Sequence, residues 1–234
     1  LTSERHEAWE NVARKLAHEI KNPLTPIKLS IDRLKNKKKK GMNISDEDFV
    51  ETIDTINRQV DDIKNLVDEF SNFARMPAPN MQKYNIKNII DNAVSLFELE
   101  SSKVVIDLDK RSLDYSVKCD ESQINRVFNN LIINSIHSIN SKYKNEPGGS
   151  IFIEGSMNDK YIKIKILDNG QGLAHKEEDL LKPYFSTKEK NIGTGLGLSI
   201  VEKIISEHGG NFHIYNLEDK SGACSEFTLR LFND

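Results

Sequence analysis

The sequence predicts two domains: an all-α helical hairpin that dimerises into a four-helix bundle, followed by an α/β sandwich. Two observations lead to this fold class. Apolar residues recur at steps of three and four through about the first 70 residues, which is the spacing of packed helices. After two prolines at 77 and 79, the pattern changes to short alternating strands between helical stretches. A length of 234 residues suits two modest domains.

The composition narrows the possible classes of function. The formal net charge of −3 argues against direct binding of nucleic acid, and 37% apolar residues are enough for a core. Cys119 and Cys224 follow no metal-ligand spacing, which is typical of a reducing compartment. No apolar run approaches the roughly 20 residues of a membrane span. We therefore expect a cytoplasmic portion, with any membrane-attached part lying N-terminal to Leu1.

Residues 1–76 are predicted to form the hairpin. The apolar seam of its first helix consists of Leu16, Ile20, Leu24, Ile27, Ile31 and Leu34. The seam of its second helix follows heptads and consists of Phe49, Ile53, Ile56, Val60, Ile63, Val67 and Phe70. The lysine-rich stretch 35–41 is interpreted as a solvated connection, and Ser45 before three acids as a helix start. Because two helices bury only one face each, we expect two hairpins to pair into a four-helix bundle.

The prolines forbid a continuing helix, so we place a linker at 77–80 and the second domain at 81–234. In this domain, helices are expected at 86–97, 121–141 and 196–208. Strands are expected at 104–108, 151–153, 161–167, 212–215 and 227–231. Helices on one face of a mixed sheet are the expected layering.

His18 is a candidate nucleophile on the first helix. At about 100° per residue it lies about 165° from the centre of the apolar seam, and Asn22 follows one turn later on the same outer face. Pro23 and Pro26 remove backbone donors and tend to bend the helix beside it. A neutral imidazole is nucleophilic near pH 7, and the adjacent Glu19 can orient it and take its proton. An exposed histidine taken alone is most often only solvated.

Three segments of the second half suggest a nucleotide site, although each alone has an ordinary reading. Asn130 and Asn134 share one helix face, and carboxamide oxygens suit Mg²⁺. Asp168 ends a strand in DNGQG, where a carboxylate can accept a hydrogen bond from an adenine amino group. The stretch 193–197 (GTGLG) runs into a helix whose amides can cradle phosphate, but it lacks the Gly-Lys-Ser/Thr of a P-loop. The stretch 182–188 before it offers cations and hydroxyls.

Taken together and in this order, the segments resemble sensor histidine kinases. AHEIKNPL resembles the H box, NNLIINS the N box, DNGQG the G1 box, KPYFSTK the F box and GTGLGLSI the G2 box. The second domain resembles the Bergerat (GHKL) ATP-binding fold of gyrase and Hsp90-type ATPases. The flanking strings, with VDEFSNFARMPAP, resemble NtrY-type nitrogen-regulation sensors. The resemblance runs from about His6 to Leu231, nearly the whole chain.

The resemblance implies an ATP- and Mg²⁺-dependent autokinase that works as a homodimer and passes phosphate to the receiver domain of an NtrX-type response regulator. His18 would be the phosphoacceptor, Glu19 its assisting base, and Asn22 the residue that positions water for removing phosphate from the regulator. Asn134 would bind the metal and Asp168 the adenine. The positions implied to contact nucleotide are Asn130, Asn134, Asp168, Gly170, Gly172, Lys188, Gly193, Thr194, Gly195, Leu196 and Gly197.

The chain departs from the family pattern at two positions. Ser135 stands where alanine usually follows the magnesium asparagine, a small change that we interpret as harmless. His137 occupies a position that is often lysine or an acid, which puts a phosphate contact there in doubt.

Two other classes of function remain open. One is a conformational ATPase of the gyrase or Hsp90 kind, which the hairpin carrying His18 argues against. The other is a dimeric scaffold without catalysis, which intact Asn134, Asp168 and the three glycines of the stretch 193–197 argue against.

Overall fold

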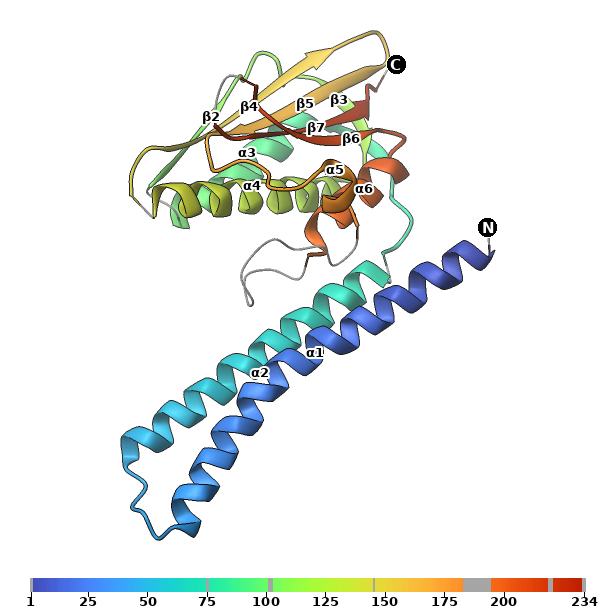
Figure 1. The fold of residues 1–234 in the computed structure, drawn as a ribbon. Coiled ribbons are helices and arrows are strands. Elements are labelled where there is room, and N and C mark those ends of the chain that lie inside the picture. The colour runs from blue at the N-terminus through green and yellow to red at the C-terminus, as the bar shows by residue number, and fades with distance from the viewer. Residues whose placement is uncertain are drawn as a thin grey trace. The chain divides into compact units, whose positions relative to one another are not determined.

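The chain folds into two compact units in a computed structural model, which describes residues 2–74, 76–100, 103–144, 146–182, 195–218 and 221–232 (Figure 1). The first unit ends at Met76, and the second begins at Pro77. The fold therefore has the two parts expected, an all-α hairpin and an α/β unit. Among the described residues, no helix combines the length and apolar character needed to cross a membrane.

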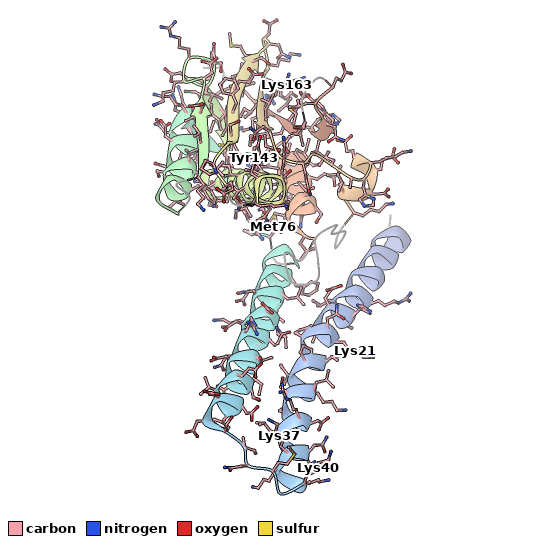
Figure 2. All side chains as sticks on the ribbon, turned by 60° about the vertical axis from the view of Figure 1, so that its left-hand side comes forward. Lys21, Lys37, Lys40, Met76, Tyr143 and Lys163 are labelled. Atoms are coloured by element: carbon pink, nitrogen blue, oxygen red, sulfur yellow. The ribbon has the colours of Figure 1, made fainter. Side chains whose placement is uncertain are left out.

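The first unit is a hairpin of two long helices, α1 (Thr2–Lys39) and α2 (Asp46–Ala74). Gly41 ends α1 with a φ of 66°, a conformation that glycine adopts without steric cost. Ser45 caps α2 as predicted, because its hydroxyl accepts a hydrogen bond from the Asp48 amide at 3.1 Å. The lysine-rich stretch predicted as a connection is mostly helical, because α1 continues through Lys39. Lys37 lies in the last turn of α1 (Figure 2), and its Nζ is 2.6 Å from Asp48 Oδ2 of α2.

The face that α2 buries inside the hairpin differs from the predicted seam. Its buried residues are Thr52, Gln59 and Leu66, spaced by seven. Four members of the predicted seam remain exposed: Phe49, Ile53, Val60 and Val67. Two of the three buried positions are polar, Thr52 and Gln59, so a pattern of apolar residues alone does not identify this inner face. The outer apolar row is left without a partner inside the hairpin.

The second unit is a five-stranded mixed sheet with its main helices on one face (Figure 1). The strand order is β2 (Val104–Leu108), β4 (Gly149–Met157), β5 (Tyr161–Asp168), β7 (Ala223–Arg230) and β6 (Phe212–Asn216). Only the β2–β4 pair is parallel. The main helices are α3 (Ile86–Glu100), α4 (Glu121–Tyr143) and α6 (Gly197–Glu207). A small sheet of β1 (Gln82–Asn85) and β3 (Ser116–Cys119) and the single turn α5 (Glu177–Leu180) complete the unit.

Alternation along β5 directs one set of side chains against the helices. Ile162, Ile164 and Ile166 are fully buried, and Asp168 continues the same alternation at the strand end. From α4, Phe128 meets Phe227 of β7 edge to face, with ring centroids 5.5 Å apart. The periodicity that forms the core therefore also carries Asp168 inward, toward α4.

The chain enters the second unit through residues that are bonded to the start of α4. The Asn80 amide donates to Asp120 Oδ2 at 2.9 Å, and Gln123 Nε2 donates to the Pro77 carbonyl at 3.0 Å. Asp120 is the N-cap of α4 and also accepts from the Gln123 amide. These bonds hold Pro77 and Asn80, which belong to the predicted linker, to the second unit.

Candidate functional site

His18 lies on α1 with 72% of its side chain exposed. Its Nδ1 is 3.9 Å from Glu19 Oε1, a distance for an ion pair but too long for a hydrogen bond. Asn22 Nδ2 donates to the other carboxylate oxygen of Glu19, at 3.2 Å. The three predicted residues thus form one connected group, with Glu19 between the histidine and the amide.

α1 continues through both prolines without a break. Each proline removes the N–H that would bond to the carbonyl four residues earlier. For Pro23 that carbonyl belongs to Glu19, and for Pro26 it belongs to Asn22. The helix is therefore weakened at the backbone of the two residues that accompany His18.

α4 and α6 meet at Gly197, the first residue of α6. A Cβ placed on Gly197 would lie 3.0 Å from Asn130 Oδ1, which is a tight contact, and 3.9 Å from Asn134 Nδ2, which is an ordinary van der Waals contact. Asn130 Nδ2 donates to the Arg126 carbonyl, which turns its Oδ1 away from its own helix backbone. The two predicted asparagines and the glycine-rich segment, distant in sequence, are thus brought together.

Asp168 is buried, with 7% of its surface exposed. Its Oδ1 accepts from the Gly170 amide at 2.9 Å and from the Ala223 amide at 3.4 Å, while its Oδ2 accepts from the Ser135 hydroxyl at 3.2 Å. Burial raises the pKa of the Asp168 carboxyl above its usual value, although these donors and the charge of Lys142 oppose the shift.

The turn after Asp168 packs directly on α4. A Cβ on Gly170 would lie 2.3 Å from Ser138 Oγ, so this position accepts only glycine. The Gln171 amide donates to Ser138 Oγ at 3.1 Å, and Lys142 Nζ donates to the Asn169 carbonyl at 2.6 Å. Residues on successive helical turns of α4 therefore hold the loop that follows Asp168 in place.

Gly172 and Gly195 both have positive φ, of 79° and 71°. Leu196 is fully buried, so its side chain belongs to the core and only its backbone can face a ligand. Lys188, Gly193 and Thr194 lie outside the described residues.

Sequence reasoning missed Ser135, Ser138 and Lys142 as parts of this site. Ser135 was interpreted as harmless, yet it is buried beside the carboxylate. A usable signal existed: Ser135 falls on the stripe of α4 that includes buried Phe128 and Leu131, and a buried hydroxyl needs a polar partner.

The arrangement can bind a nucleotide and a hard cation. A buried anionic acceptor suits a base that carries an amino group, and two carboxamide side chains close to a helix start can supply neutral oxygen ligands for Mg²⁺ beside phosphate. Among the described residues, no group of three His, Cys, Asp or Glu side chains forms a metal cluster. The carboxamides of Asn130 and Asn134 are neutral oxygen ligands of the kind that Mg²⁺ accepts together with phosphate oxygens.

Two family models match the chain. The His Kinase A (phospho-acceptor) domain matches residues 8–79. The histidine kinase-, DNA gyrase B- and HSP90-like ATPase matches residues 119–233.

Curated relatives match along almost the whole chain. Nitrogen regulation protein NtrY of Azorhizobium caulinodans is 39% identical over 232 residues, which cover 98% of this chain and 30% of the relative. A putative sensor histidine kinase NtrY-like of Rickettsia typhi is 36% identical over 225 residues, covering 94% and 36%. The chain thus spans between 30% and 36% of the length of these two relatives.

Solved structures share the fold. The histidine kinase ThkA in complex with the response regulator TrrA matches 98% of this chain and 64% of that chain, with a TM-score of 0.76 and 24% identity. The catalytic domain of ThkA alone matches 65% of this chain and 96% of that chain, with a TM-score of 0.54 and 28% identity.

Proposed function

Since the chain belongs to the sensor histidine kinases of the NtrY type, we propose that it uses ATP to phosphorylate His18 and passes the phosphoryl group to an aspartate of a response regulator. The observation that carries this proposal is the combination of two sites in one chain. An exposed histidine with a carboxylate neighbour lies on the hairpin, and a buried carboxylate, two asparagines and a glycine-rich helix start converge in the other unit.

The position of Glu19 favours one tautomer of His18. Glu19 is the carboxylate beside Nδ1, at 3.9 Å, and a shift of its side chain to hydrogen-bond distance would place the proton on Nδ1 and leave the lone pair on Nε2. Nε2 attacks the γ-phosphorus, the N–P bond forms as the bond to the β-bridging oxygen breaks, and ADP leaves. Glu19 takes the Nδ1 proton, which keeps the phosphorylated ring neutral.

The second unit supplies nucleotide binding. Asp168 accepts from the adenine amino group, and the backbone amides at the start of α6 face phosphate. Asn134, with Asn130 one turn before it, would hold Mg²⁺, which when bound neutralises the charge of the phosphate oxygens. Phosphoryl transfer requires that the bound nucleotide reach His18. Because Pro77 and Asn80 are bonded to α4, we place the pivot for this movement at Met76.

The exposed apolar row of the hairpin supports a homodimer. Phe49, Ile53, Val60 and Val67 of α2 are exposed, and so are Leu24 and Ile31 of α1. Two long helices with such rows bury them most simply against the same rows of a second copy, which gives a four-helix bundle.

The regulator is a receiver domain that docks beside His18 and Asn22, and its type is taken to be NtrX-like by analogy with the NtrY relatives. Asn22 donates to Glu19 through its amide nitrogen, and its carboxamide oxygen is an acceptor that can orient a water for hydrolysis of the regulator's acyl phosphate. The chain would act on the cytoplasmic side of the membrane.

The test is incubation of the chain with γ-labelled ATP and Mg²⁺. We expect an acid-labile, base-stable phosphoprotein that His18→Gln abolishes while ATP binding persists. Rapid release of phosphate without protein labelling would instead support a conformational ATPase. Failure to bind ATP would support a non-catalytic scaffold.

A further inference from the structure

The buried hydroxyl of Ser135 touches the centre of the nucleotide site. Ser135 is 4% exposed, and its Oγ donates to Asp168 Oδ2 at 3.2 Å. Phe128 and Leu131, on the same stripe of α4, pack in the core. A hydroxyl on this stripe costs free energy unless it is hydrogen-bonded, and the Asp168 carboxylate is the partner that it has.

The two oxygens of Asp168 have different amounts of acceptor capacity left. Each carboxylate oxygen accepts about two hydrogen bonds. Oδ1 already accepts from two backbone amides, those of Gly170 and Ala223. Within the described part of the chain, Oδ2 has the Ser135 hydroxyl as its hydrogen-bond donor. The remaining acceptor site is therefore on Oδ2.

Ser135 also limits rotation of the carboxylate. The terminal torsion of an aspartate is broad and roughly two-fold, so donors on one oxygen alone leave the plane poorly defined. The Ala223 contact is long, at 3.4 Å, and contributes less than the Gly170 bond at 2.9 Å. A donor on Oδ2 from a rigid helix fixes the plane from the opposite side.

We propose that Ser135 is a positioning residue for adenine selectivity, which holds Asp168 Oδ2 so that its free acceptor site meets the exocyclic amino group of the base. This inference rests on the proposed ATP-dependent function. It assigns a role to a residue at which the chain departs from the family's usual alanine.

The experiment compares ATP with purine riboside triphosphate, which has the same phosphates and ring but lacks the 6-amino group. Dissociation constants are measured by calorimetry for the parent chain, Ser135→Ala and Ser141→Ala. Ser141 is a matched control on α4, because its exposed hydroxyl donates to the His137 carbonyl of its own helix at 2.9 Å. We expect Ser135→Ala to weaken ATP about two- to tenfold and the analogue much less, with Ser141→Ala unchanged.

A purely structural role for Ser135 gives a different result. Its loss would then weaken both nucleotides by the same factor, and this outcome overturns the inference, as does no change in either. In the background of Asp168→Asn, Ser135→Ala should leave the ratio of the two affinities unchanged, since the two residues act through one contact.

Failure of the two proposals can be told apart. If the parent chain binds neither nucleotide, the ATP-dependent function itself falls. If the parent prefers ATP and Ser135→Ala keeps the full preference, only the role of Ser135 falls.

Discussion

At the scale of single residues, Glu19 is shared between two neighbours with different tasks. Its Oε1 faces His18, and its Oε2 accepts from Asn22. A carboxylate fixed from one side by an amide presents its other oxygen to the imidazole in a defined direction. Asn22 thus supports the kinase reaction indirectly, and its own carbonyl oxygen is left for water.

Substitution of Asn22 should separate the two activities. We expect Asn22→Ala to lower autophosphorylation only about two- to threefold, because it removes one part-buried hydrogen bond between a neutral and a charged group. Dephosphorylation of the regulator should fall at least about tenfold, the scale of losing a group that orients a nucleophile. The measurements are label gained by His18 and label lost from a purified regulator, and Glu19→Gln should show the opposite bias. An Asn22→Ala chain that dephosphorylates the regulator at the parental rate would refute this division.

Asp168 makes ATP binding sensitive to pH. Burial raises the pKa of its carboxyl, so the proton returns at a less acidic pH than for an exposed aspartate. The protonated carboxyl is neutral and is therefore a weaker hydrogen-bond acceptor for the Ser135 hydroxyl and for the adenine amino group. We therefore expect ATP affinity to be full when the carboxyl is ionised and to decline as the pH falls, at a less acidic pH than for an exposed aspartate.

The dissociation constant of ATP as a function of pH checks the prediction. Asp168→Asn is the control, because asparagine has nearly the shape of aspartate but does not titrate. Any pH dependence that remains in this variant comes from other groups, such as the phosphates of ATP. Parallel curves for the parent and Asp168→Asn would contradict the assignment.

How well single residues could be predicted depended on whether their role is local. The outward orientation of His18 follows from the spacing of the apolar residues next to it in the sequence, so a short segment is enough to predict it. The link from Ser135 to Asp168 joins residues 33 positions apart, and no local pattern encodes it. The alanine-to-serine departure was visible in the sequence, but its meaning required the partner across the fold.

At the scale of elements, the start of α4 connects three parts of the second unit. The Asp120 side chain caps α4 and accepts from Asn80, while its backbone amide donates to Nε2 of buried His208 at 3.0 Å. His208 Nδ1 lies 2.7 Å from the Ile204 carbonyl near the end of α6, so this nitrogen carries the proton and donates. The helix with the asparagines, the helix after the glycine-rich segment and the entry of the chain therefore share one set of bonds.

Loss of the Asp120 side chain should loosen this junction. We expect Asp120→Ala to lower the free energy of unfolding by about 1–2 kcal/mol, the scale of a lost helix cap. The melting temperature should fall by a few degrees, measured by circular dichroism. Asp159→Ala, in the exposed turn between β4 and β5, is the control and should melt with the parent. Equal melting of Asp120→Ala and the parent would show that the cap contributes nothing.

Helices and strands were predictable where the hydrophobic pattern was regular over a long stretch of sequence. The alternation of β5 and the apolar stripes of α4 and α6 were sufficient, and their predicted bounds fit those observed within a few residues. β1 and β3 are four residues each and stabilised by pairing with one another across 30 intervening positions, which no short window reveals. The single turn α5 was missed for the same reason of length.

At the scale of the whole molecule, the exposed apolar row of α2 is the feature that the chain by itself leaves unexplained. Val60 is 50% exposed and Ile53 40% exposed, one heptad apart, while polar Thr52 and Gln59 occupy the face toward α1. An isolated hairpin designed for solubility would have the opposite distribution. The pattern follows if the row is the core of a bundle between two copies.

Charges placed in this row should therefore separate the copies without unfolding either unit. We expect the double variant Ile53→Asp, Val60→Asp to change a dimer into a monomer at micromolar concentration, measured by sedimentation velocity, because two like carboxylates per chain would be buried without partners. ATP affinity should be unchanged, since the nucleotide site lies within the other unit. Val105→Asp is the control, because Val105 is an equally exposed apolar residue, at 59%, on β2 and outside the hairpin. If the double variant sediments as a dimer, the row does not form the interface, and some other face of the hairpin must pair the copies.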